Sequence, residues 1–252
     1  MLNNTTFRQN YQAADWYKSN LKVLVACSGG VDSTVLLHLL TEIHDLEISI
    51  VHFDHQLRGS ESDSDREFIK RVGADLGYPV HVVTEDIEAY AKLNDMSLEE
   101  AGSVRRRSAF MNLLDQLSYD YVATGQHVDD QIETILMNIY QGSGIQGLSG
   151  ISEWNGSFIR PLLGYTREEI NDYSKTHQLE YRTDQSNADI SFLRNNIRAN
   201  VIPALNADID HRLRTSLEGI LREGQAINAL IETSIEDIDI KGFRSDYVPK
   251  IA

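Results

Sequence analysis

The sequence has a single cysteine and no long apolar run. With only Cys27, the chain can form neither an internal disulfide framework nor a cysteine-rich zinc site. No apolar run approaches the roughly 18 residues that a membrane span requires, and the polar start MLNNTTFRQN lacks the apolar core of a signal peptide. These absences exclude disulfide-rich secreted and membrane-spanning classes, and we expect a soluble cytoplasmic protein without a membrane partner.

Positive charge is also scarce. The chain carries 23 Lys and Arg against 38 Asp and Glu, a formal net charge of -15. This balance disfavours indiscriminate nucleic-acid binding, which depends on neutralising phosphates. A local basic face is still compatible with it, because Arg105, Arg106 and Arg107 are consecutive and Arg194 and Arg198 follow later. Spacing alone leaves isolated surface charges and a phosphate-binding patch as open alternatives.

The order of apolar segments predicts an α/β fold. Strands are expected over residues 21–27, 46–54, 79–83, 119–125 and 157–163, and helices over 32–44, 64–78, 97–117 and 129–142. This alternation predicts a parallel, doubly wound sheet covered on both faces, with the ligand beyond the C-terminal ends of the strands. From residue 164 the pattern turns helical, including a helix at 211–233. We therefore expect a nucleotide-binding α/β domain over 1–163 and a helical extension over 164–252.

The stretch between the first strand and the first helix predicts an anion site. It reads Ser28-Gly29-Gly30-Val31-Asp32-Ser33. Glycines allow a sharp turn that exposes backbone N–H groups, and the following helix directs its positive end at the same space. No Lys-Ser/Thr pair follows the glycines, so this is not a Walker loop. Two glycines alone would fit an ordinary strand–helix turn; the full string favours a phosphate site.

Two further groups of side chains are candidates for chemistry. Asp130 and Glu133 share a helix face, which suits binding of an ammonium group and acceptance of its proton. The alternative is a solvated acidic helix start stabilised by the helix dipole. His52 and His55 are spaced like metal ligands, but strand alternation places them on opposite faces and no third ligand is evident. We therefore expect polar contacts and no metal site there.

These motifs together resemble a known family. The string SGGVDS is similar to the pyrophosphate loop of the ATP pyrophosphatase, or PP-loop, superfamily. The stretches HFDHQLR (52–58), DDQIET (129–134), RPLL (160–163) and RNNIR (194–198) extend the likeness. As a set, over residues 21–205, they resemble the N-terminal catalytic domain of the tRNA(Ile)-lysidine synthetases.

The resemblance implies an ATP-dependent ligase that uses Mg²⁺. ATP adenylates the C2 oxygen of cytidine 34 in an isoleucine tRNA with a CAU anticodon, and free L-lysine then displaces AMP. The implied catalytic residues are Asp32, His127, Asp130, Glu133, Arg106 and Arg194, with Arg198 behind them. The implied nucleotide contacts are the 28–33 loop, His52 and Arg58. For His127, a catalytic or positioning role and that of a hydrogen-bonded loop histidine stay open.

The sequence departs from the family pattern at three positions. Ser103 stands where the family usually has arginine, Arg107 where it has tyrosine, and Gln126 where it has the first of two histidines. A non-catalytic nucleotide-binding paralogue is the alternative that these departures support. A related 2-thiolase is a second alternative, but such enzymes need a reactive cysteine pair or a cluster-binding set. The single cysteine argues against it.

Overall fold

A computed structural model describes residues 1–57, 59–182 and 193–202, with scattered positions between 216 and 230. Its centre is a six-stranded sheet of order β3-β2-β1-β4-β6-β5. The strands are β1 (Leu21–Ala26), β2 (Leu46–Asp54), β3 (Val80–Thr84), β4 (Tyr121–Ala123), β5 (Trp154–Asn155) and β6 (Phe158–Ile159). Every pair is parallel except β5 with β6. The predicted doubly wound parallel sheet is confirmed, and its strand order reverses at β1.

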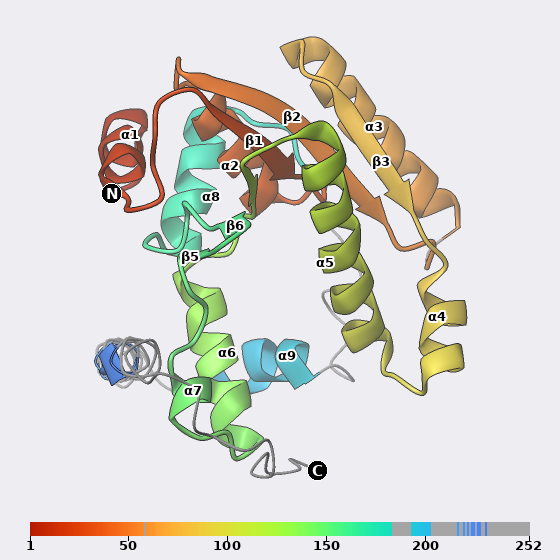
Figure 1. Cartoon of the computed structure of the whole chain (residues 1–252), viewed down its shortest axis with the longest axis vertical. Helices are drawn as coiled ribbons and strands as arrows, with labels where there is room; N and C mark the ends of the chain where they lie inside the picture. The colour runs from red at the N-terminus through yellow and green to blue at the C-terminus, as the bar shows by residue number, and fades with distance from the viewer. Residues whose placement is uncertain are drawn as a thin grey trace, which may run out of the picture.

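Helices cover both faces of the sheet and extend past one of its ends (Figure 1). One face packs against α1 (Asn4–Ala13), α2 (Val31–Thr41), α3 (Ser60–Leu76) and α8 (Arg167–Thr176). The other packs against α4 (Ile87–Asn94) and α5 (Leu98–Leu117). Beyond the sheet lie α6 (Val128–Tyr140), α7 (Ile145–Leu148), α9 (Leu193–Asn196) and the π-helical turn η2 (Ile197–Val201). Within the described residues, no helix is long and apolar enough to cross a membrane.

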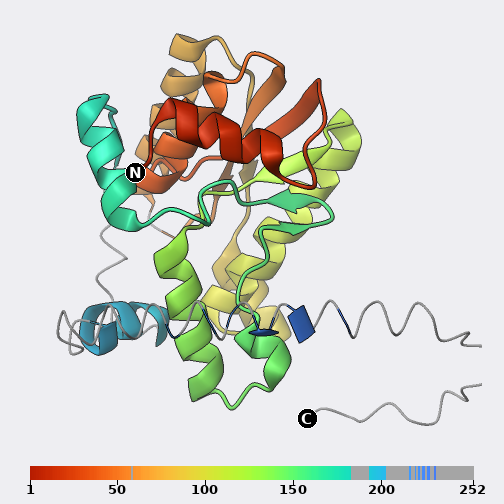
Figure 2. The ribbon, with the colours of Figure 1, turned by 90° about the vertical axis from the view of Figure 1, so that its left-hand side faces the viewer.

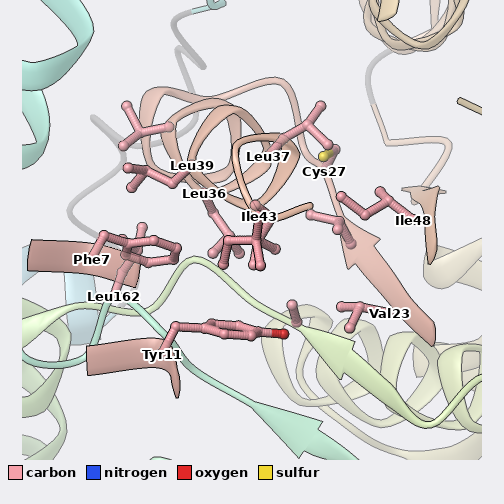
Figure 3. Close-up of a cluster of buried hydrophobic side chains, with 14 of the residues drawn as sticks. Phe7, Tyr11, Val23, Cys27, Leu36, Leu37, Leu39, Ile43, Ile48 and Leu162 are labelled. Carbon is pink, nitrogen blue, oxygen red and sulfur yellow. The ribbon is translucent and has the colours of Figure 1, made fainter. Parts of the chain in front are cut away.

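The core explains why β1 lies at the centre. Leu21, Val23, Leu24 and Val25 are fully buried, as expected for a parallel strand covered on both faces. Against one face, α2 contributes Leu36, Leu37 and Leu39; Figure 3 shows Leu37 beside Cys27, and the aromatic rings of Phe7 and Tyr11 from α1 in the same cluster. This double cover anchors the turn that follows β1.

Helix α1 was not predicted. Residues 1–20 look polar as a whole, yet Phe7 and Tyr11 fall one turn apart and both are buried. Asn3 caps the helix, because its Oδ1 accepts the backbone N–H of Thr6 at 2.9 Å. Figure 2 shows α1, in red, in front of the sheet. Its apolar side chains complete the core next to α2.

Several element boundaries also differ from the predictions. Helix α3 begins at Ser60, four positions before the expected start, and α4 and the β5 strand were missed. The strand expected over 157–163 is limited to Phe158–Ile159, and Pro161, which has no N–H, cannot extend the ladder. The segment 193–202 is helical as predicted. The helix predicted over 211–233 lies largely outside the described residues.

Candidate functional site

The turn after β1 leaves the start of α2 open to a ligand. Gly29 has a φ of 91°, which a side chain would strain. The Ser33 hydroxyl closes the turn, because its Oγ accepts the N–H of Ser28 at 3.2 Å and donates to the Gly30 carbonyl at 3.0 Å. No side chain caps α2 at Gly30. The first N–H groups of α2 are therefore available to an anion at the C-terminal edge of the sheet.

Two distant segments fix this turn from outside. The carbonyl of Gly29 accepts the backbone N–H of Arg182 at 2.9 Å. The loop after β4 also packs closely on the start of α2: a Cβ added at Gly125 would lie 3.0 Å from the carbonyl carbon of Asp32. Because β1 and β4 are neighbours, the loop that carries His127 lies directly beside Asp32.

His127 connects the turn to helix α6. Its side chain is fully buried; Nδ1 accepts the N–H of Asp129 at 3.2 Å, and the backbone N–H of His127 donates to Asp130 Oδ2 at 3.0 Å. The neutral ring therefore carries its proton on Nε2. That atom lies 3.7 Å from Asp32 Oδ1 and 3.5 Å from Asp130 Oδ2. His127 thus stands between the turn of residues 28–33, which we call the phosphate turn, and the carboxylates of α6.

The pKa values in this crevice reflect burial among charges. Burial lowers the pKa of His127, but the carboxylates of Asp129, Asp130 and Asp32 outweigh it, so its pKa is raised. Burial also raises the pKa of Asp32, an effect that His127 and Arg167 partly offset. Arg167, whose NH1 lies 3.7 Å from Asp32 Oδ2, was missed by the sequence reasoning because no motif marks the first turn of α8.

The second half of the site is a cluster of ion pairs on α6. Arg198 binds Glu133 through two of its guanidinium nitrogens, with Nε 2.6 Å from Oε1 and NH2 2.9 Å from Oε2. Its NH2 also lies 3.7 Å from Asp130 Oδ1, so the two carboxylates share a face as predicted. Arg194 Nε lies 3.5 Å from Glu133 Oε2, and its NH2 donates to Thr134 at 2.9 Å. Glu133 itself is only 1% exposed.

The predicted arginine of α5 reaches the same region. The surrounding protein partly dehydrates Arg106 and lowers the pKa of its guanidinium, and the positive charge of Arg194 lowers it further. Water still reaches the side chain of Arg106. The structure therefore brings Arg106 of α5 near Arg194 of α9, although they are far apart in the sequence.

Other predicted residues lie at the base of the turn. His52 is buried, and its Nδ1 is 2.8 Å from the carbonyl oxygen of Cys27. Cys27 follows β1 and is buried, as predicted for a small core residue. Arg58 lies outside the described residues. Within the part of the chain that the structure describes, no group of three or more His, Cys, Asp or Glu side chains could hold a metal ion.

Several polar atoms of the crevice lack a hydrogen bond. Asp32 Oδ1, His127 Nε2 and Arg194 Nε are buried and have no hydrogen-bond partner among the described residues. Buried polar groups are nearly always satisfied in folded proteins. The three atoms lie along the charged contacts that lead from Asp32 through His127 and Asp130 to Glu133, which fits a site that a polar ligand completes.

The open helix start, the glycine turn and the switch point in the strand order together define a class of α/β nucleotide-binding domain, in which the turn between the first strand and its helix is open to a phosphate group. Residues 3–205 match the PP-loop domain family, and the chain belongs to that family.

Named relatives share the likeness along most of this chain. It is 37% identical over 216 residues to a tRNA(Ile)-lysidine synthase of Chlorobaculum tepidum, covering 84% of this chain and 65% of that protein. It is 40% identical over 205 residues to one from Porphyromonas gingivalis strain W83, covering 79% and 45%. The chain thus spans less than two thirds of either relative. The U34-tRNA thiolase NcsA of Methanococcus maripaludis shares the fold, with a TM-score of 0.67 at 19% identity over 87% and 77% of the two chains.

Proposed function

We propose that this chain carries the catalytic domain of a tRNA(Ile)-lysidine synthase. It would join free L-lysine to C2 of cytidine 34 in an isoleucine tRNA with a CAU anticodon, in the cytoplasm, releasing AMP and pyrophosphate. The observation that carries the proposal is the contact through His127, which sets the phosphate turn against the carboxylates of α6. Similarity to the named synthases supports the same reaction.

The phosphate turn fits the nucleotide. The residues 28–33 and the open N–H groups of α2 would hold the triphosphate, with His52 and Arg58 as further nucleotide contacts. Mg²⁺ would be bound largely by phosphate oxygens and water, with the carboxylate of Asp32 facing it. ATP supplies the adenylyl group: the cytidine O2 bonds to the α-phosphorus, and the bond to the β-phosphate breaks.

The carboxylates of α6 fit the second half-reaction. The lysine ε-nitrogen forms a bond to C2, the bond from C2 to the AMP oxygen breaks, and one amine proton must leave. Asp130, whose side chain is 16% exposed, is accessible to the amine, whereas Glu133 at 1% is held by Arg198. We infer that Asp130 accepts the proton. Glu133 supports the lysine pocket indirectly, because it fixes Arg198 and Arg194 beside Asp130.

The positive groups of the crevice fit the developing phosphate charge. The charge of Arg194 lowers the pKa of Arg106, so two positive groups face this region, and Glu133 compensates only Arg194; this suits neutralisation of a phosphate of ATP or tRNA. Arg167, Arg194 and Arg198 all belong to the later part of the chain. We therefore propose that residues 164–252 complete the catalytic crevice that the nucleotide-binding unit, residues 1–163, begins.

Reconstitution tests the proposal. The protein is incubated with ATP, Mg²⁺, labelled lysine and the CAU isoleucine tRNA, and label in the tRNA is counted. We expect label to enter the tRNA that carries C34 and not a transcript that carries U in its place, because uridine differs from cytidine in the groups around the reacting C2. AMP formed with tRNA but without lysine incorporation would identify another nucleophile. Absence of both products would favour the non-catalytic paralogue.

The thiolase alternative predicts a reactive sulfur, and the structure points the other way. Burial raises the pKa of the Cys27 thiol to about 12. The thiolate fraction falls tenfold for each pH unit below the pKa, so at pH 8 only about one thiol group in ten thousand is deprotonated. We expect iodoacetamide at pH 8 to leave Cys27 unmodified in the native protein and to alkylate it in guanidinium chloride, as read by mass spectrometry. Rapid alkylation of Cys27 in the native protein would contradict the structure and support the thiolase hypothesis.

A further inference from the structure

The three consecutive arginines of α5 have three different environments. Successive helical residues are rotated by about 100°, so they point in different directions. Arg105 is neutralised by Glu85, with Nε 2.5 Å from Oε2 and NH2 2.9 Å from Oε1, and lies 5.0 Å above the Tyr90 ring. Arg107 lies 4.8 Å above the Phe158 ring and has no carboxylate partner among the described residues. The three consecutive arginines therefore form neither a single phosphate-binding patch nor three equivalent surface charges.

A second uncompensated arginine lies beside Arg107. Arg160 follows β6 and is only 8% exposed. Its Nε donates to Gln126 Oε1 at 2.5 Å and its NH1 to the Ser152 carbonyl at 2.6 Å. Both acceptors are neutral, and within the described residues no carboxylate lies within ion-pair distance of Arg160. A buried cation without a counter-ion is costly.

The electrostatics around Arg160 point to a missing negative charge. Burial lowers the pKa of Arg160 to about 10, and the charge of Arg107 adds to this effect. Arg107 lies over the ring of Phe158, and Arg160 follows Phe158 by two residues, so side chains that alternate along the strand place both guanidinium groups on the same face. An anion placed between them would supply the counter-charge that the protein does not.

Gln126 adds neutral donors to the same place. Its Oε1 accepts from both Arg160 and the Thr124 hydroxyl, the latter at 3.1 Å. Two donors on one atom identify it as the oxygen, so the amide NH₂ is the end left to donate to a ligand. Gln126 and Arg107 are two of the three positions at which the sequence departs from the family pattern, and both lie around Arg160.

We propose that Arg107, Arg160 and Gln126 form a binding subsite for a phosphodiester group of the RNA substrate. That the ligand is RNA rests on the proposed function. Arg107 and Arg160 lie off the nucleotide cradle, because β6 is two strands from β1 and neighbouring strands are about 4.8 Å apart. Gln126 belongs to the loop between the two sites, since Gly125 and His127 on either side of it contact Asp32. Arg107 is exposed on α5, so an extended polyanion can reach it from solvent. The triphosphate has its own donors in the 28–33 turn.

Salt-dependent binding of tRNA tests the subsite with a matched pair of variants. Arg107→Gln and Arg105→Gln remove the same charge from the same helix, two residues apart, and each arginine lies over an aromatic ring. Filter binding to the CAU isoleucine tRNA, without ATP or lysine, is measured between 50 and 200 mM salt. We expect Arg107→Gln to reduce the slope of log K against log salt by about 0.7–0.9, the values for one lost phosphate contact to a single strand and to a duplex, and Arg105→Gln to leave it unchanged.

Gln126→Glu gives a second readout in the opposite direction. This isosteric change supplies the missing counter-charge from within, so we expect a higher melting temperature together with weaker tRNA binding. A Gln126→Glu protein that binds tRNA like the parent, or equal slopes for the two arginine variants, would overturn the proposal. So would a loss of ATP affinity in Arg107→Gln with tRNA binding intact, because the phosphate would then be the nucleotide's. Binding is read without turnover, so failure of lysine incorporation leaves this test independent.

Discussion

Replacing Glu133 by glutamine is expected to lower the free energy of unfolding by about 3 kcal/mol and to abolish lysine incorporation. The carboxylate is almost fully buried and accepts hydrogen bonds from Nε and NH2 of Arg198. Glutamine keeps the size but removes the carboxylate that Arg198 and Arg194 share, which leaves Arg198 only the longer contact to Asp130 at 3.7 Å. Removing one member of a buried pair costs about 3–5 kcal/mol. The lower end applies because Arg198 is 32% exposed. Urea unfolding and labelled-lysine incorporation measure the two effects.

Two controls separate the structural loss from the catalytic one. Glu67→Gln breaks an exposed pair with Lys70 and is expected to change stability by less than about 1 kcal/mol. The double variant Glu133→Gln/Arg198→Met removes both charges and is expected to recover part of the stability but none of the activity. If Glu133→Gln unfolds like the parent, the bidentate pair does not hold α9 and η2 against α6.

Replacing Asp32 by asparagine is expected to abolish AMP formation without destabilising the fold. Burial raises the pKa of Asp32, and the charge of Asp130 raises it further, against the lowering effect of His127 and the arginines. The folded state thus carries a carboxylate whose charged form it disfavours, a cost typical of functional sites. Asparagine removes that charge and, with it, the carboxylate that we propose faces the nucleotide.

The sign of the pH dependence makes this second prediction sharper. A carboxyl group with a raised pKa in the folded state stabilises the protein when protonated, and this stability is lost as the pH rises from the ordinary value of 3.8 through the raised one. Asparagine does not titrate, so the stability of Asp32→Asn relative to the parent should increase across that window. Unfolding curves from pH 4 upward measure it, alongside tRNA-dependent AMP release at neutral pH. If the stability of Asp32→Asn relative to the parent decreased with rising pH, the raised pKa of Asp32 would be contradicted.

The parts of the fold set by local pattern were predictable from the sequence. Strand β2 was predicted with the correct ends because its run of apolar and β-branched residues is bounded by turn residues. Helix α5 begins at the predicted cap, since Ser97 accepts the N–H of Glu100 at 3.2 Å. The phosphate turn was recognisable because its glycines and polar side chains are contiguous.

The parts set by distant contacts were not predictable. The α6 spacing shows that Asp130 and Glu133 share a face, but not that Arg198, 65 positions beyond Glu133, occupies that face. Arg167 meets Asp32 only because α8 packs on α2. The row of arginines on α5 was ambiguous for the same reason: Glu85, Phe158 and Arg194 decide the environment of each, and they come from other elements.

The hydrogen bond from Arg182 to the Gly29 carbonyl gives the phosphate turn a place in the order of synthesis. Gly29 leaves the ribosome early, and at about 5–20 residues per second its partner Arg182 follows roughly 8–30 s later. Until then the carbonyl lacks the bond that fixes the peptide plane of the turn. A nascent chain would therefore build its sheet before the turn proposed to hold the nucleotide gains its last backbone contact, because Arg182 follows α8, the last of the helices that pack on the sheet.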